Sequence, residues 1–178
     1  HMSQWASTID KITNAKNVLF IISTGNINSQ TNQVTNPGIT EHLNARRSYP
    51  EYLLTKASRI SNPVQSCFAI TVGSVCCNSY DDLDKKSFGI QNDPSAFTRT
   101  GPGIWKMIKP DVVEYGGDFI REKIANPNIS QLPATSTEVV RTTTAGGNAV
   151  GYDNGSSYAA PKVSHIAGQI LNVFPEAS

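Results

Sequence analysis

The sequence predicts an α/β fold in which helices pack on a parallel sheet, and two observations carry that prediction. Two short apolar runs rich in β-branched residues, at 18–23 and 68–75, are typical of strands buried on both faces of a parallel sheet. Apolar residues recur at helical spacing near both ends of the chain, over 3–14 and from Val163 onward. Ligand-binding loops are expected where parallel strands end, so Asn26, just past the first run, is a candidate site residue.

The remaining segments are assigned from turn formers and short apolar patterns. Residues 27–38, rich in Asn, Gln, Thr and Ser, predict a solvated loop, and a short helix is expected near 49–58. Residues 76–96 are interpreted as loop, and a third strand is expected at 111–115. The alternating stretch 137–150 predicts a hairpin-like excursion that leads into the last helix.

Length and charge limit the possible partners. The chain has 178 residues and 38% apolar residues, enough for one domain with a core but not for two of ordinary size. Its 15 Lys and Arg are scattered and balanced by 14 Asp and Glu, which leaves no footprint for nucleic acid or an anionic membrane. No run approaches the ~20 apolar residues of a membrane span. The opening residues 1–2 are interpreted as a cloning scar, so the domain is expected to comprise residues 3–178.

Three cysteines, Cys67, Cys76 and Cys77, make an odd number with two direct neighbours, so no disulfide framework is expected. Buried thiols are the expectation, and this cysteine usage favours a cytoplasmic location. No base is indicated near any of them, so nucleophilic cysteine chemistry is not expected.

The stretch NGSSYAAPKV, residues 154–163, places serines at the start of the last helix. A serine such as Ser157 can cap backbone N–H groups there, or it can present a hydroxyl where the helix dipole favours developing negative charge. Capping is the commoner role for a serine considered alone. Pro161 lies inside the early part of this helix, where proline removes a backbone hydrogen bond and lowers stability. An unfavourable residue so close to a serine indicates a functional site.

Four segments, in this order, resemble the subtilisin-like serine proteases over essentially the whole chain. STGN is similar to the family's A-A-G-N oxyanion segment, and FAITVGSV to its strand I-x-V-G-A-V. FTRTGPG with IKPDVVEYGG resembles F-S-x-x-G-P and K-P-D-(I/V)-x-A-P-G, and GSSYAAPKVSHIAG resembles G-T-S-M-A-x-P-H-V-A-G. The resemblance implies the parallel sheet of the subtilisin-like fold, here as a partial domain.

Position by position, the resemblance assigns roles to particular residues. Ser157 matches the nucleophile, and Asn26 matches the asparagine whose amide helps to bind the oxyanion. Ser23, Thr24 and Gly25 match one wall of the primary specificity pocket, so they are expected to bind substrate. The resemblance implies a peptide or protein substrate, and it requires no organic cofactor and no catalytic metal.

The histidines depart from the family pattern. The position of the usual helix histidine is Lys162, and His165 lies eight residues beyond Ser157, roughly 12 Å along the helix axis and out of reach. His42 follows Asn26 in a polar stretch and is expected to face solvent.

The catalytic Asp and His of the family precede the oxyanion asparagine, but only Asp10 and His1 do so here, and neither a D-(S/T)-G nor an H-G-T motif is present. The chain is therefore interpreted as the C-terminal half of a subtilisin-like catalytic domain that is inactive alone. Its expected partner is the missing upstream half, and its open apolar sheet edge predicts a possible homodimer.

Two other functions stay open. A pseudo-protease, a protein-binding module with the same fold, would lack the two upstream motifs altogether. An esterase of another α/β family would show G-x-S-x-G and a later histidine, but the chain reads G-S-S-Y-A at this point and no histidine follows His165. The acidic cluster Asp81, Asp82 and Asp84 could ligate calcium, but it lacks the spacing of a recognisable loop and is expected to be a solvated turn.

Overall fold

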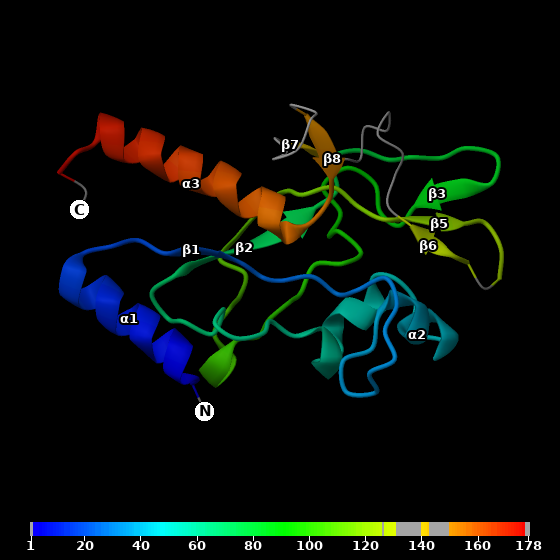
Figure 1. Ribbon diagram of the computed structural model, residues 1–178, viewed down its shortest axis with the longest axis horizontal. Helices are drawn as coiled ribbons and strands as arrows, with labels where there is room; N and C mark the ends of the chain where they lie inside the picture. The colour runs from blue at the N-terminus through cyan, green and yellow to red at the C-terminus, as the bar shows by residue number, and fades with distance from the viewer. Residues whose placement is uncertain (1, 126, 131–139, 143–149, 177–178) are drawn as a thin grey trace.

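A three-stranded parallel sheet organises the chain. The computed structural model describes residues 2–125, 127–130, 140–142 and 150–176 (Figure 1). The sheet has the strand order β1-β2-β4, and both pairs are parallel. Its strands are β1 (Ile21–Ser23), β2 (Ile70–Val75) and β4 (Val112–Tyr115). The predicted α/β class with a parallel sheet is confirmed, because the apolar runs at 18–23 and 68–75 and the stretch 111–115 supply its three strands.

Two long helices flank this sheet. Helix α3 (Ser156–Val173) packs across all three strands, and α1 (Gln4–Lys16) lies on the other side of the sheet in Figure 1. Ser3 caps α1, since its Oγ accepts the N–H of Ala6 at 3.1 Å. Pro161 lies inside α3 as the sequence indicates.

Shorter elements fill the connections. Strands β3, β5 and β6 form an antiparallel sheet, and β7 pairs with β8 just before α3. The β7–β8 pair is the expected hairpin-like excursion, although 131–139 and 143–149 fall outside the described residues. The shorter elements are α2 (Ile39–Asn44), the 3-10 helices η1 (Glu51–Leu54), η2 (Lys56–Ser58) and η3 (Ile104–Lys106), and the strands β3 (Lys85–Ser87), β5 (Ile120–Glu122), β6 (Ile129–Ser130), β7 (Val140–Thr142) and β8 (Gly151–Asp153).

The apolar core has two parts. The smaller part lies between the sheet and α3, where Val72 meets Ala159 and Ala160. The larger part lies under α2, the 3-10 helix η1 and the antiparallel sheet, and it is built around Tyr52 and Phe97. Because side chains from 27 to 129 contribute to this second part, it fixes the loops that follow the ends of the parallel strands.

Several sequence predictions are wrong in detail. The run 18–23 is not buried on both faces: Val18 is 43% exposed, and β1 is half-buried because it pairs on one edge only among the described strands. The helix expected near 49–58 is a pair of 3-10 turns, and 76–96 contains a strand as well as loop. His42 does not face solvent but is fully buried, because it stacks on a core tyrosine.

The cysteines also differ from expectation, since Cys76 is buried but Cys67 and Cys77 are half-buried; none of the three forms a disulfide. In the part of the chain that the structure describes, no helix is both long enough and apolar enough to cross a membrane. The acidic turn is held internally, because Asp82 accepts hydrogen bonds from the Tyr80 hydroxyl and the N–H of Asp84.

Candidate functional site

The side chain of Asn26 meets the start of α3. Asn26 lies three residues past the end of β1, and its Oδ1 accepts two hydrogen bonds from Ser156, from the backbone N–H at 3.0 Å and from Oγ at 2.8 Å. Ser156 is fully buried, whereas Asn26 is exposed, so these bonds are partly shielded from water. Because both donors hold Oδ1, the amide orientation is fixed, and its Nδ2 lies beside Gly155, where an added Cβ would approach it to 3.1 Å.

Ser157 is the second residue of α3 and lies directly after the serine that holds Asn26. Its side chain is exposed, and its Oγ makes no hydrogen bond with the described residues. The N-cap position of α3 is taken by Gly155, and Ser157 lies inside the helix, so the Ser157 side chain is not the cap of this helix. The Ser157 N–H is in the first helical turn, where amides lack partners within the helix and the dipole favours an anion.

The turn before α3 is tied to the end of β4. Gly155 has φ +153°, a conformation that favours glycine, and its N–H donates to the Gly116 carbonyl at 2.8 Å. Gly116 must also lack a side chain, since a Cβ there would lie 2.6 Å from the Gly155 carbonyl oxygen. The buried Asn154 donates its Nδ2 to the Asp118 carbonyl at 2.6 Å. These contacts set where the helix begins.

Asp118 is a buried carboxylate that the sequence analysis did not single out. It accepts the backbone N–H groups of Phe88 and Gly89 at 3.0 Å each and that of Ala96 at 2.8 Å. Burial raises its pKa, although these N–H bonds act in the opposite direction. Asp118 therefore links the segment after β4 to two loops of the larger core. A single acid among glycines gave no sequence signal for this role.

The three residues before Asn26 form the exit of β1. Thr24 is buried, and its N–H donates to the Val72 carbonyl at 2.9 Å, which extends the parallel ladder by one bond. Ser23 is half-buried, and Gly25 has φ +84°, a turn conformation suited to glycine. The structure thus places Ser23, Thr24 and Gly25 in one strand exit that leads directly to the Asn26 amide.

A cavity of about 500 Å³ opens on one side of Asn26. Polar and aromatic groups share its wall, which suits a peptide backbone together with a side chain. Its lining includes Asn26, Asn28, Gln30, Phe97, Phe119 and Asp153. Residues Asn28 and Gln30, just beyond Asn26, were assigned only to a solvated loop from the sequence.

Neither described histidine reaches Ser157. His42 is buried against Tyr52 with ring centroids 5.1 Å apart, and desolvation by burial lowers its pKa. His165 is exposed on α3, eight residues after Ser157 and roughly 12 Å along the axis. His1 lies outside the described residues.

Two other groups near the start of α3 are engaged elsewhere. The Tyr158 hydroxyl donates to Asp153 at 2.6 Å, and this bond raises the pKa of Tyr158 to about 12, so it stays protonated near neutral pH. Lys162 donates its Nζ to the Tyr115 carbonyl at 2.8 Å. Neither is therefore placed to remove a proton from Ser157.

Comparison with known proteins identifies the family. The sequence profile described as "Subtilase family" matches residues 1–178, the whole chain. The chain belongs to the subtilase family. This confirms the resemblance drawn from the four segments, and it supports a protease-like function for this subtilase.

One relative is a protein of Sinorhizobium fredii described as "Uncharacterized protein y4bN", which is 34% identical over 188 residues. The match covers 98% of this subtilase chain but 40% of the relative, so the chain spans less than half of the relative's length. No solved structure gives a significant match.

Proposed function

We propose that this subtilase chain carries the nucleophile and the oxyanion-binding groups of a serine endopeptidase. In this proposal Ser157 Oγ attacks the peptide carbonyl, its proton passes to a histidine, and the amine leaves with that proton to give an acyl-enzyme that water hydrolyses. Ser23, Thr24 and Gly25 hold the substrate at the exit of β1.

The pair of bonds from Ser156 to Asn26 carries this proposal. They bind the oxygen of the amide and leave Nδ2 beside Gly155, two residues before Ser157. In this proposal Nδ2 and the Ser157 N–H both donate to the oxyanion. Two donors that converge next to an exposed hydroxyl are what the tetrahedral intermediate of acyl transfer requires, because its negative charge concentrates on one oxygen. Capping the start of α3 needs only the acceptor Oδ1, and it places no demand on Nδ2.

The general base and its carboxylate partner belong to sequence upstream of this chain in our proposal. No described histidine contacts Ser157, and the nearby Tyr158 and Lys162 are engaged elsewhere. An unassisted serine hydroxyl is a weak nucleophile, so the 178-residue chain alone is expected to be inactive. The same observation favours a second candidate, a protein-binding subtilase domain that has lost the base.

A fluorophosphonate probe, which reacts with activated serines, distinguishes these functions. The chain by itself should stay unlabelled, while a chain extended upstream to include D-(S/T)-G and H-G-T segments should be labelled at Ser157. Ser157→Ala should abolish the labelling. Ser164→Ala is the matched control: it removes an exposed serine of the same helix, whose Oγ only bonds the Ala160 carbonyl at 3.1 Å, and should leave labelling unchanged.

Two results would contradict the proposal. A folded, lengthened chain that stays unlabelled would favour the binding domain instead. Rapid labelling of the 178-residue chain would show that a base within it reaches Ser157.

A further inference from the structure

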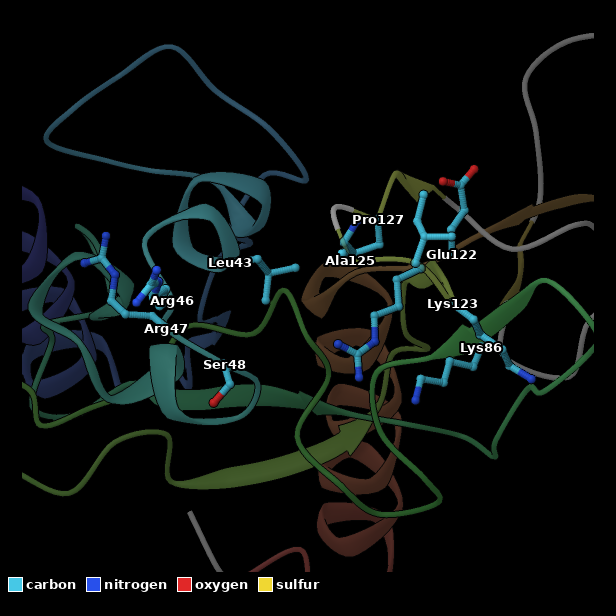
Figure 2. A pocket seen from close by; sticks show the side chains of 11 residues that line it. Leu43, Arg46, Arg47, Ser48, Lys86, Glu122, Lys123, Ala125 and Pro127 are labelled. Atoms are coloured by element: carbon cyan, nitrogen blue, oxygen red, sulfur yellow. The ribbon is translucent and has the colours of Figure 1, made fainter.

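A second hollow, here called the basic cleft, lies between the end of α2 and the antiparallel sheet. Its volume is about 500 Å³, and its lining carries five cationic side chains and one acidic side chain, Glu122. Figure 2 shows Arg46 and Arg47 on one side, with Lys86 and Lys123 on the other. The fifth cation of the lining is Arg121. None of these residues belongs to the site around Ser157.

The sheet places two of these cations directly opposite each other. Lys86 of β3 pairs with Arg121 of β5 in the antiparallel register, so both side chains project to the same face. Like charges in directly opposed positions destabilise a sheet. An unfavourable pair at the wall of a cleft indicates that an anion fits between them.

Arg121 gives an independent sign of a missing partner. Its guanidinium lies over the Phe88 ring, with Cζ 4.9 Å from the centroid, and this contact fixes the side chain. Its Nε is buried and has no hydrogen-bond partner among the described residues. A buried cationic donor without an acceptor is costly, so Arg121 gains from a bound carboxylate that draws its guanidinium toward the cleft and accepts a charge-assisted bond.

The acids around the cleft neutralise little of this charge. Glu122 accepts the Asn128 side-chain amide at 3.0 Å, and Asp81, which faces Lys86 across a backbone bridge, forms its ion pair with Lys123. Within the described part of the chain, Arg46, Arg47, Lys86 and Arg121 form no ion pair. Four cationic groups therefore remain available to a ligand.

We propose that the basic cleft binds an acidic peptide segment, whose Asp or Glu carboxylates lie between the α2 cations and those of the sheet. Leu43 and Ile124 in the lining can contact the methylene groups of such side chains, which a bare phosphate does not have. Nucleic acid fits less well, because the cations gather in one cleft instead of a stripe and the net charge is only +1.

The cleft lies close to the cavity beside Asn26. Phe119 lines that cavity and Arg121 lines the cleft, and two residues of extended chain span roughly 7 Å. Helix α2 links the two places from the other side, since the Ile39 N–H donates to the Asn28 carbonyl at 2.9 Å. The idea that the acidic segment is part of a substrate rests on the proposed function. Binding of the segment in the basic cleft is independent of that function.

Fluorescence anisotropy with a labelled ten-residue Asp/Glu peptide, compared with its Asn/Gln counterpart, tests the cleft in the 178-residue chain. The acidic peptide should bind more tightly, and added salt should weaken its binding. Arg47→Gln combined with Lys86→Gln should weaken it about tenfold or more, because one cation is lost from each side. Ser157→Ala should bind the peptide as the parent chain does, so a failure of the proposed catalysis leaves this result intact.

The matched control combines Lys11→Gln with Lys56→Gln, which removes the same charge from exposed positions outside the cleft. It should change the affinity by less than about twofold, since distant surface charges are screened. Circular dichroism checks that both double variants are folded. Equal binding of the two peptides, equal weakening by both double variants, or stronger binding of polyphosphate or a single-stranded oligonucleotide would overturn the proposal.

Discussion

Substitutions of Asn26 separate its two roles. Asn26→Asp keeps an oxygen that accepts the N–H and Oγ of Ser156 at 3.0 and 2.8 Å, but it replaces the Nδ2 donor with a second oxygen. Asn26→Leu removes both the acceptor and the donor. Asn26→Leu should therefore lower both the stability and the turnover. Asn26→Asp should lower the turnover but largely keep the stability.

The magnitudes follow from these contacts. Asn26→Leu leaves two donors of the fully buried Ser156 without an acceptor, at about 1–3 kcal/mol each. The lower end is expected because Asn26 itself is exposed and water can replace one bond. About 2 kcal/mol corresponds to a fall in Tm of about 4–8 °C for a chain of this size. Asn26→Asp should change Tm by less than half as much.

Turnover should fall in both variants. Loss of one oxyanion donor lowers kcat about a hundred- to a thousandfold, a magnitude measured on a subtilisin, a member of this family, and carried over here. KM should stay nearly unchanged, because the lost interaction forms mainly in the transition state. The assay is peptide hydrolysis by a chain lengthened upstream, with thermal unfolding measured in parallel. An Asn26→Asp variant that keeps a third or more of the activity would refute the role of Nδ2.

Three further outcomes are expected. Gly155→Ala should destabilise the chain by about 1–3 kcal/mol in thermal unfolding, because φ is +153° and the new Cβ would meet the Asn26 amide. Gly168→Ala is the control: the space around Gly168 is open, so this substitution should stabilise α3 slightly in the same assay. Burial alone would raise the pKa of Asp10, but hydrogen bonds from Ser66 and two backbone N–H groups hold this pKa below 3.8. The parent chain should therefore be more stable than the Asp10→Asn variant above pH 3.8, and this difference should disappear as the pH falls further. One edge of β1 pairs with no described strand, and Leu19 beside it is exposed, so a dimer or aggregation is expected. A clean monomer in sedimentation at high concentration would contradict this.

The sequence alone predicted the elements whose signal is local. The apolar runs at 18–23 and 68–75 form strands because β-branched residues suit a buried pleated surface, and these two parallel strands are where the prediction holds. The last helix begins at the serines that the sequence indicated, with Pro161 inside it. Four motifs in order were enough to identify the family before any contact was known.

Helix α2 and His42 show where local signals fail. The stretch around His42 is polar, so it predicts a histidine that faces solvent, yet His42 and the neighbouring Ile39 are fully buried. The reason lies in distant residues: the Tyr52 ring stacks on His42, and the carbonyls of the loop after Asn26 receive the first N–H groups of the helix. Burial of this kind depends on tertiary contacts, which the polarity of the residues in the segment does not reveal.

The resemblance named residues for the candidate site but not their arrangement. Sequence comparison singled out Asn26 and Ser157, but only the fold brings together groups 130 positions apart and gives Ser156 the task of orienting the amide. The basic cleft has the same origin, since its cations are scattered along the chain and meet only because β3 pairs with β5 beside α2. Motifs fix which chemistry is available. Long-range pairing and burial decide which groups face one another, because these depend on the free energy of the whole fold.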